Sequence, residues 1–385
     1  MQECYLPTGN EWVSLPTLQA RTGALESFSF LHMGYKGLIE QRGGASLPLM
    51  TPFFETEGER ASLQSLTWGR KSDWIPTFCG TAGSLAVEGM LLAPVGERGF
   101  LYQLTVRSTS DKPLSSTFGL EGCWASAWHC VNEDKEIDGA RRCYTSLWND
   151  SLIFDMRCGL PLFAFAPMMD QPCSSTFQET DAGIVYRLAH ACTLEPGEAV
   201  TVTFYWGVGF EEVAAATSAK EMLRQGWQHE LQVTTDWLDA RRWPIPDAQL
   251  ERLYNTNLFF CLFYSAGITL DTEELVLVTS RSPRYYVSAA YWDRDSLLWS
   301  FPTVVDADPA LARRMLDYVF GRQRRNLGVH SRYIDGTVLE PGFELDELMA
   351  PVLALERYVG ATGDRDCLED NAIRSGQASD RKSVV

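Results

Sequence analysis

The feature that most constrains the fold is a change of pattern near residue 211, from short alternating strands to helical segments. Residues 1–210 hold many short runs in which apolar and polar side chains alternate, which is the period of a half-buried β-strand. In 200–206, for example, the apolar residues at every second position are Val200, Val202, Phe204 and Trp206. Because turn signals rather than helices separate the runs, we expect an antiparallel β-sandwich over 1–210.

Helical composition follows the strands. The mixture of Ala, Glu, Leu, Gln and Arg in 213–242 predicts a helical linker over 211–245, which Pro244 and Pro246 punctuate. We predict a helix over 247–263, where the residues at helical spacing are Leu250, Leu253, Tyr254, Asn257 and Leu258.

The clearest helix start is at Asp308. Asp308 is a good N-cap and Pro309 suits the first helical position, so a helix is predicted from there. A further apolar helix over 345–359 stops in the sequence Gly-Ala-Thr-Gly at 360–363, and another begins near Asp364. Helices that alternate with loops in this way are typical of helical hairpins.

Composition excludes several classes of function. The net charge of −17 is poor for binding a polyanion, so nucleic acid is an unexpected partner. No apolar run reaches the roughly 18 residues of a membrane span, and the first residues lack the pattern of a secretory leader. The ten cysteines are scattered singly, so we expect reduced thiols in a cytoplasmic protein without a metal or cofactor. The sequence does not indicate an oligomeric state.

The C-terminal segment breaks the helical pattern. Residues 366–374 resemble the start of a helix, yet the sequence ends about ten residues later. The last six residues, 380–385, read Asp-Arg-Lys-Ser-Val-Val, which a common sequencing adapter also encodes in one frame. We therefore expect a non-native tail at 380–385 and an incomplete helical domain over 246–379, a polar terminus being the alternative.

Two polar segments are candidate sites. The first, 291–296, reads Tyr-Trp-Asp-Arg-Asp-Ser and places two carboxylates and a guanidinium beside an indole. Carboxylates accept hydrogen bonds from vicinal hydroxyls, arginine donates them, and indole covers the apolar face of a sugar ring. The alternative is an ordinary junction between a loop and a helix, with Asp295 as the N-cap and Arg294 in a local ion pair.

The second segment, 342–352, carries three acids within four positions at a helix start, namely Glu344, Asp346 and Glu347. Glycoside hydrolysis needs a carboxylic acid that protonates the departing oxygen, and partial burial can keep an acid protonated near neutral pH. Acids also suit the dipole of a first helical turn, which is the structural alternative.

Together these motifs resemble the six-hairpin, (α/α)6 glycoside hydrolase clan. The run Trp292-x-Arg294-Asp295-Ser296 matches a short motif shared by glycogen-debranching-type α-glucosidases and metal-independent exo-α-mannosidases. The run from Glu344 to Leu348, with Thr-Gly-Asp at 362–364, is similar to the acid-bearing segment of the mannosidases. The resemblance covers 291–364 at the level of motifs. It implies a multidomain β-then-α chain, in which an N-terminal antiparallel β-sandwich precedes a truncated (α/α)6 toroid.

The resemblance also implies roles for individual residues. Asp346 would be the general acid, with Glu347 the weaker candidate. Trp292, Arg294 and Asp295 would contact the terminal sugar of an oligosaccharide or polysaccharide, and Asp293 would contact it less. Members of the clan invert configuration with a second carboxylate as base on a later loop. That base would be absent here, so the 385-residue chain is expected to be inactive.

Three functions therefore stay open. The first is an inverting, metal-independent exo-α-glycosidase acting on an α-glucan or an α-mannoside. The second is a glycoside phosphorylase of the same fold, in which phosphate replaces water. The third is a non-catalytic carbohydrate-binding protein. Sugar identity and linkage cannot be read from the motifs, because they depend on loops from all six hairpins.

Overall fold

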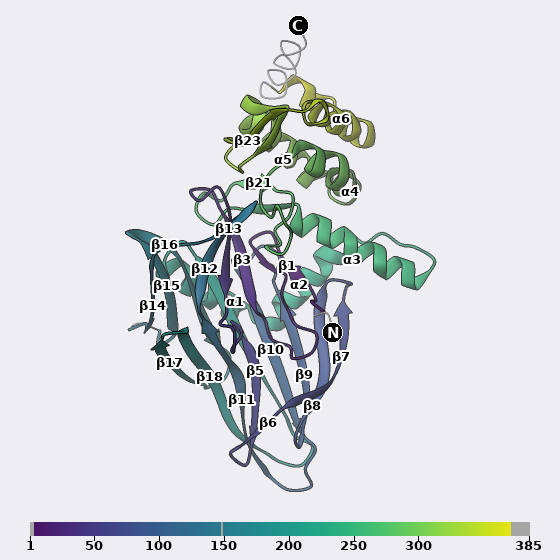
Figure 1. Cartoon of the computed structure of the whole chain (residues 1–385). Coiled ribbons are helices and arrows are strands. Elements are labelled where there is room, and N and C mark those ends of the chain that lie inside the picture. Colours follow the sequence, from purple (N-terminus) through teal and green to yellow (C-terminus); the bar gives the residue numbers. More distant parts are fainter. Residues whose placement is uncertain (1–3, 148, 371–385) are drawn as a thin grey trace. The chain divides into compact units, whose positions relative to one another are not determined.

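Strands dominate the first 209 residues and helices follow, as the computed structural model shows for residues 4–147 and 149–370 (Figure 1). This order confirms the prediction that a β region precedes a helical region along the chain. The chain divides into two units. The sandwich unit comprises Met1–Phe28, Glu40–Trp128 and Glu136–Leu238, and the hairpin unit comprises Ser29–Ile39, His129–Lys135 and Asp239–Val385. The domain boundaries expected near residues 210 and 245 stay predictions.

Three sheets hold the long strands, and the strand pairs of the eight-stranded and five-stranded sheets are antiparallel. The eight-stranded sheet has the order β14 (Ala140–Thr145), β15 (Leu152–Cys158), β16 (Leu160–Met169), β19 (Ala199–Gly209), β10 (Gly99–Ser108), β9 (Leu85–Leu92), β8 (Ile75–Ala82) and β7 (Leu63–Lys71). The five-stranded sheet has the order β17 (Ser174–Thr180), β18 (Gly183–Leu194), β11 (Leu114–Trp124), β5 (Thr51–Thr56) and β6 (Glu59–Ala61). A six-stranded sheet runs β1 (Thr8–Gly9), β2 (Val13–Leu15), β3 (Ser27–His32), β4 (Gly37–Arg42), β12 (Ser126–Val131) and β13 (Glu133–Glu136).

Aromatic side chains fill the space between the five-stranded and eight-stranded sheets. The ring of Trp124 on β11 lies 5.0 Å from that of Phe165 on β16, and Tyr186 on β18 lies 5.2 Å from Phe154 on β15. All four residues are buried. Such tilted ring pairs add specific geometry to a large buried apolar area. The two sheets therefore face each other across a shared core, which is the architecture of a sandwich.

Helix α1 (Glu212–Gln225) packs on the eight-stranded sheet along a seam of small residues. A Cβ atom added at Gly207 would lie 2.1 Å from the carbonyl oxygen of Ala215, and one added at Gly209 would lie 2.4 Å from the backbone nitrogen of Ala215. The facing alanines Ala215 and Ala219 are fully buried. Glycine is therefore required here by close approach of the helix backbone to β19. Helix α2 (Trp227–Asp239) follows after Gly226.

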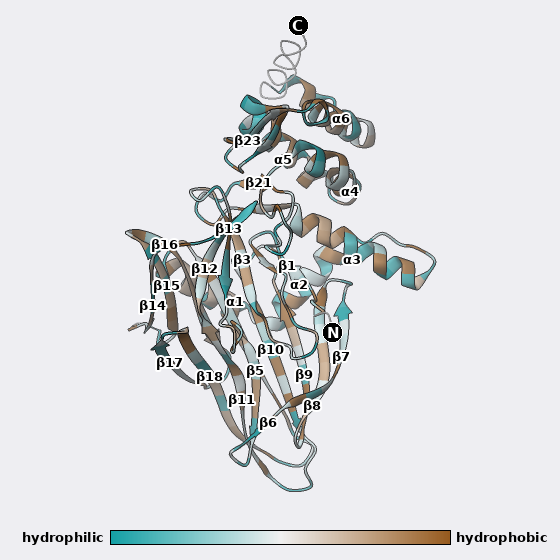
Figure 2. Ribbon diagram, viewed as in Figure 1, coloured by the Kyte–Doolittle hydropathy of each residue, from teal (hydrophilic) through white to brown (hydrophobic). Residues whose placement is uncertain are grey.

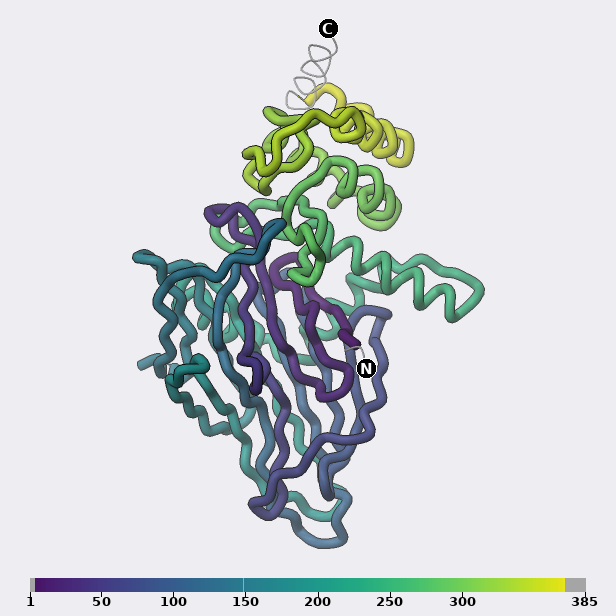
Figure 3. The backbone as a smooth tube through the Cα atoms, viewed as in Figure 1, coloured from purple at the N-terminus to yellow at the C-terminus, as the bar shows by residue number. Residues whose placement is uncertain are grey.

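The described part of the hairpin unit contains four α-helices, several short π- and 3₁₀-helical segments and two short β-hairpins, and Figure 3 traces the path of its chain. The helices are α3 (Ala248–Tyr264), α4 (Phe301–Ala307), α5 (Pro309–Tyr318) and α6 (Leu345–Thr362). The hairpins pair β20 (Ala266–Ile268) with β21 (Leu275–Leu277) and β22 (Val329–Arg332) with β23 (Val338–Phe343). Both predicted helix starts are confirmed, since Asp247 caps α3 and Asp308 accepts a hydrogen bond from the backbone of Leu311 at the start of α5.

Apolar side chains on two of these helices remain exposed. On α3, Leu250 and Leu253 are 51% and 61% exposed, although their spacing predicts one apolar face. On α6, Leu345, Met349 and Leu353 stand four residues apart and are 63%, 42% and 46% exposed. Figure 2 colours both helices by hydropathy. Within the described residues these faces have no covering partner, and we refer to the three α6 residues as the α6 stripe.

Two further expectations concern the cysteines and the C-terminus. Among the described residues, none of the ten cysteines forms a disulfide. Beyond α6, Asp366–Glu369 forms a short 3₁₀ turn, and the expected tail at 380–385 lies outside the described residues. Among the described helices, none combines the length and the apolar character that crossing a bilayer requires.

Candidate active site

The first motif lies between a backbone bridge and a helix. The backbone N–H of Tyr291 donates to the carbonyl of Arg332 at 2.9 Å, and the N–H of Arg332 donates back at 3.0 Å. Arg294 then begins η1, a π-helical segment (Arg294–Ser300) that continues into α4. Asp295 therefore lies inside the first helical turn, and the alternative that made it the N-cap is wrong. π-Helical insertions of this kind recur at functional sites.

A buried charge cluster stands behind the motif. The side chains of Asp293, Arg332 and Glu347 are each fully buried. The guanidinium of Arg332 donates to Asp293, whose other oxygen accepts a hydrogen bond from the hydroxyl of Tyr291. Burial raises the pKa of Asp293, while Arg332 and Tyr291 lower it. Asp293 was expected to contact substrate weakly, but both of its oxygens are occupied and closed to solvent.

Glu347 joins the two motifs through the backbone. Its Oε2 atom accepts hydrogen bonds from the backbone N–H of Asp293 at 2.6 Å and of Arg294 at 3.3 Å. The other oxygen, Oε1, is buried without a hydrogen-bond partner in the described structure. Burial is the largest influence and raises the pKa of Glu347 to about 8, with the Asp293 charge acting in the same direction. A carboxyl in this position carries a proton at neutral pH.

Arg294 is the centre of an outer cluster of acids. Its Nη1 atom donates to Asp346 at 2.8 Å and to Glu344 at 3.2 Å, and its Nε atom lies 3.6 Å from Asp295. The hydrogen bond from Arg294 holds the pKa of Asp346 below its usual range. The Asp346 side chain is 47% exposed, whereas that of Asp295 is 14% exposed. The structure thus brings both predicted motifs together and presents Asp346 to solvent.

Trp292 lies beside a histidine that the motifs do not include. Its indole packs edge-on to His330 at 5.7 Å and is only 6% exposed, so little of its face is open to a sugar. The Nδ1 atom of His330 is 2.8 Å from Glu344, and its Nε2 atom is 3.5 Å from Glu340. This polar network extends the site along the β22–β23 hairpin. Sequence reasoning missed His330 and Glu340 because 329–341 carries no recognised motif.

Asp295 opens onto a small hollow with aromatic walls. The hollow has a volume of about 310 Å³, and Phe260, Tyr285 and Trp299 contribute to its lining. Trp299 is 64% exposed, and burial raises the pKa of Asp295. Trp299 follows Asp295 by four positions within one helical segment, so this shared face could have been predicted from spacing. A carboxylate beside an exposed indole offers both kinds of contact that a sugar ring accepts.

A larger hollow of the hairpin unit, about 650 Å³, lies away from both motifs. Four arginines contribute to its lining, at positions 314, 322, 324 and 325. Three acids share the lining, and each has a cationic partner: Arg322 binds Glu274, Arg313 binds Asp317 and Lys36 binds Asp335. Because no predicted site residue lines this hollow, its size does not make it the candidate active site.

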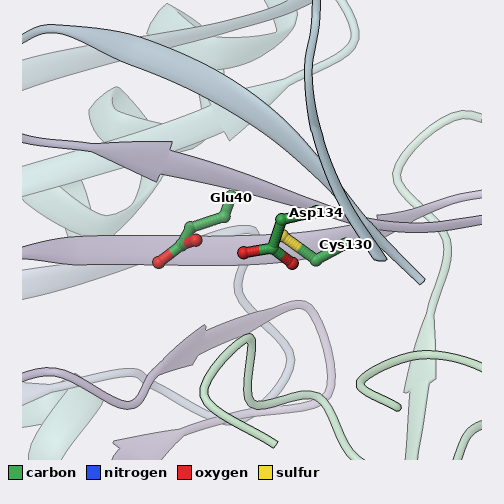
Figure 4. A group of neighbouring side chains, drawn as sticks. All are labelled: Glu40, Cys130 and Asp134. Carbon is green, nitrogen blue, oxygen red and sulfur yellow. The ribbon is translucent and has the colours of Figure 1, made fainter. Parts of the chain in front are cut away.

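A separate group of possible metal ligands comes from neighbouring strands of the six-stranded sheet. Figure 4 shows Glu40, Cys130 and Asp134, on β4, β12 and β13, whose ligand atoms lie within 4.8 Å of one another. The carboxylate of Glu40 already accepts a hydrogen bond from Arg42 at 2.5 Å. One thiol with two carboxylates also differs from the Cys and His sets of structural zinc sites. We therefore assign no metal to this group.

Comparison with known proteins places the fold. No family model matches the chain, and no curated protein matches its sequence. Among solved structures, it is similar to one described as a kojibiose phosphorylase from human microbiome, with a TM-score of 0.59 and 10% identity over 95% of this chain and 55% of that chain. It is also similar to a bacterial glucoamylase in complex with acarbose, with a TM-score of 0.54 and 10% identity over 93% of this chain and 56% of that one.

These likenesses are at the level of fold. The chain shares the fold of a region of a glycoside phosphorylase and of a glucoamylase, and it spans just over half the length of each. At 10% identity neither likeness assigns a residue role. The function must therefore be argued from the site around Arg294.

Proposed function

We propose that this chain is part of a carbohydrate-active enzyme that cleaves an α-glycosidic bond with inversion. We further propose that its substrate site surrounds Arg294 and Asp346. The observation that carries the proposal is the geometry of Arg294, whose guanidinium lies among Asp295, Glu344 and Asp346. Such a cluster can donate to and accept from the hydroxyls of one sugar ring. The fold shared with a glycoside phosphorylase and a glucoamylase supports this assignment.

In this proposal Asp346 is the general acid. Its carboxylate is accessible, but its low pKa in the free protein is opposite to what a proton donor needs. A sugar hydroxyl that takes the hydrogen bond of Arg294 would release Asp346, and exclusion of water by the substrate would then raise its pKa. Arg294 and Asp295 would hold the terminal sugar, and Trp292, which is almost buried, would contribute at most a small contact.

Glu347 remains the weaker candidate for the acid. Its pKa of about 8 keeps a proton at neutral pH, which a general acid requires. However, the side chain is fully buried, and one oxygen already accepts two backbone N–H groups. We therefore assign Glu347 a positioning role, in which it holds the turn that carries Arg294.

The partner base is the part of the mechanism that these residues do not supply. An inverting site needs a second carboxylate roughly 6.5–9.5 Å from the acid, on the opposite side of the sugar. Since this chain spans just over half the length of these neighbours, we propose that the base comes from further sequence, and that the 385 residues alone bind glycans without turnover. Turnover by this purified chain would contradict the proposal.

Two alternatives keep the same site. A glycoside phosphorylase would use phosphate in place of water, which the likeness to a kojibiose phosphorylase favours. A non-catalytic glycan-binding protein would use Arg294 without an acid. Assays of a longer polypeptide distinguish these three functions. A phosphorylase releases a sugar 1-phosphate only when phosphate is present, a hydrolase releases free sugar without phosphate, and a binding protein shows no turnover.

The direct test is calorimetric titration of the chain with acarbose and with an α-linked mannobiose. Arg294→Ala should weaken binding by about tenfold or more, because it removes a charged donor. Asp317→Asn is the matched control, since Asp317 is an exposed acid paired with Arg313 elsewhere in the hairpin unit. In a longer active polypeptide, Asp346→Asn should lower the rate by about 10²–10⁴ with binding retained. Equal affinities of Arg294→Ala and Asp317→Asn would refute the assigned site.

A further inference from the structure

We propose that the sandwich unit carries a glycan-binding site of its own, in a hollow at the junction of α1 and α2. The hollow has a volume of about 580 Å³, within the range of small-molecule sites. It is bounded by the turn after β16, the start of β19 and the residues that join the two helices. All of its lining belongs to the sandwich unit, so the inference does not depend on the proposed catalytic site.

Trp227 contributes to the lining of this hollow, and its backbone is anchored to the sheet. The backbone N–H of Trp227, the first residue of α2, donates to the hydroxyl of Tyr205 at 3.0 Å. Tyr205 is buried in β19, so this bond ties the start of α2 to the sheet. The Trp227 side chain is partly exposed, and its indole N–H has no hydrogen-bond partner among the described residues. The lining of the hollow therefore includes an aromatic residue with an unused donor.

Unused polar groups surround the indole. The Oδ1 atom of Asp170 accepts a hydrogen bond from the backbone of Thr203 at 2.9 Å, and its second oxygen has no partner in the described structure. The side-chain amides of Gln171 and Gln228 also make no hydrogen bond to described residues, and both side chains are exposed. The hollow thus presents amide donors and acceptors, one carboxylate oxygen and one indole N–H. Adjacent sugar hydroxyls need such a mixture of donors and acceptors.

The charge of the lining narrows the class of ligand. Among the described residues that line the hollow, Asp170 is the one charged group, and none is Lys, Arg or His. Phosphate, sulfate and uronate groups are therefore disfavoured, unlike at the arginine-lined hollow of the hairpin unit. A single carboxylate also supplies too few oxygens for a divalent cation. The chemistry points to neutral hexose units of an oligosaccharide or polysaccharide.

A site of this kind would hold polysaccharide on the sandwich unit. A weak contact suffices for that purpose, because a second attachment to the same polymer raises the local concentration of chain ends. The inference therefore predicts binding to a neutral polymer that survives the loss of the Arg294 cluster.

Affinity electrophoresis tests the inference on the full 385-residue chain. The protein is run in native gels containing soluble starch, glycogen or a neutral α-mannan, with hyaluronate as the anionic polymer. We expect the protein to migrate more slowly in at least one neutral polymer and to migrate at its normal rate in hyaluronate. Trp227→Ala should weaken binding by about tenfold, which is ~1.4 kcal/mol. Trp243→Ala is the matched control, because Trp243 is 49% exposed and lies outside the hollow.

Variants of exposed side chains distinguish a loss of binding from a loss of fold. Gln228→Ala and Gln171→Ala change exposed side chains without hydrogen-bond partners, and each should weaken retardation several-fold with an unchanged circular dichroism spectrum. Arg294→Ala should still be retarded by the neutral polymer, because the hollow of the sandwich unit is unchanged. The inference is overturned if no neutral polymer retards the chain, if hyaluronate retards it equally, or if Trp227→Ala and Gln228→Ala both migrate like the parent. Loss of retardation in Arg294→Ala alone would assign all binding to the hairpin unit.

Discussion

The Oε2 atom of Glu347 accepts a hydrogen bond from the backbone N–H of Asp293 at 2.6 Å, across 54 positions of the sequence. This contact connects the first turn of α6 to the turn that carries Arg294. Because both residues are fully buried, the charge state of Glu347 affects the stability of the connection. The segments 291–296 and 342–352 are thus physically linked, so a substitution in one should alter the stability or the pKa values of the other.

Glu347→Gln should flatten the dependence of stability on pH. The folded pKa of Glu347 is about 8, against an ordinary value of 4.5, so between these values the folded chain binds a proton that the unfolded chain does not. Its contribution to stability is complete below about pH 4.5 and is lost as pH rises through 8. Glutamine mimics the neutral acid, so the variant should lack this loss. Unfolding in denaturant at pH 5, 7 and 9 measures it.

A second buried acid provides the control for this pH series. Burial, together with Glu97, raises the pKa of Glu230 in the sandwich unit to about 7, so it contributes a pH dependence of the same sign. Glu230→Gln should remove the pH dependence of stability that Glu230 contributes and leave the pH dependence that Glu347 contributes. A parent-like pH profile in Glu347→Gln would contradict the assignment.

Breaking the buried ion pair should destabilise the hairpin unit strongly. Arg332→Met leaves Asp293 buried without its guanidinium partner, and such losses typically cost about 3–5 kcal/mol. Arg357→Met removes an exposed pair with Asp306 and should cost less than about 1 kcal/mol. Urea unfolding monitored by fluorescence compares them. The double change of Arg332→Met with Asp293→Asn should recover part of the loss, and failure to recover any would show that packing dominates.

Removing Arg294 should raise the pKa of Asp346. The hydrogen bond from Arg294 is the main cause of the low value, so Arg294→Ala should shift the carboxyl titration upward toward the ordinary range. Carbon-detected NMR titration of aspartate carboxyls reports this shift directly. Arg294→Lys keeps the charge and should give an intermediate value. An unmoved Asp346 titration in Arg294→Ala would show that the ion pair is not formed in solution.

The α6 stripe should promote self-association. Its three apolar residues stand at positions four apart, so they form one line on the helix surface. Met349→Gln with Leu353→Gln should shift the protein toward monomer in sedimentation velocity runs. Lys220→Gln, at an exposed position of α1 in the sandwich unit, is the control. Monomeric behaviour of the parent chain at high concentration would contradict this prediction.

Local signals account for what could be predicted of the fold. Asp247 and Asp308 cap helices because their side chains reach backbone N–H groups two or three residues ahead, which depends on nearby sequence alone. By contrast, the spacing of Leu250 and Leu253 shows that they share a face, but spacing cannot show whether anything covers that face. Their exposure therefore became known only from the structure.

The site was predictable at the level of motifs and not of contacts. The spacing of 291–296 and 342–352 indicated two polar segments, and the structure joins them through Arg294. The burial of Asp293 could not be foreseen, because its partner Arg332 lies 39 positions away on β22. Long-range pairing decides which acid of a cluster is buried and which is open, and this distinguishes Glu347 from Asp346.

The glycine seam between β19 and α1 has a practical consequence for dissecting the chain. Gly207 and Gly209 leave a strip of bare backbone on the outer surface of the eight-stranded sheet, and Ala215 and Ala219 close it. An isolated sandwich cut at residue 210 would lose this lid and expose the strip to water. A fragment that ends after α2, at Asp239, keeps the lid and is the better candidate for independent expression.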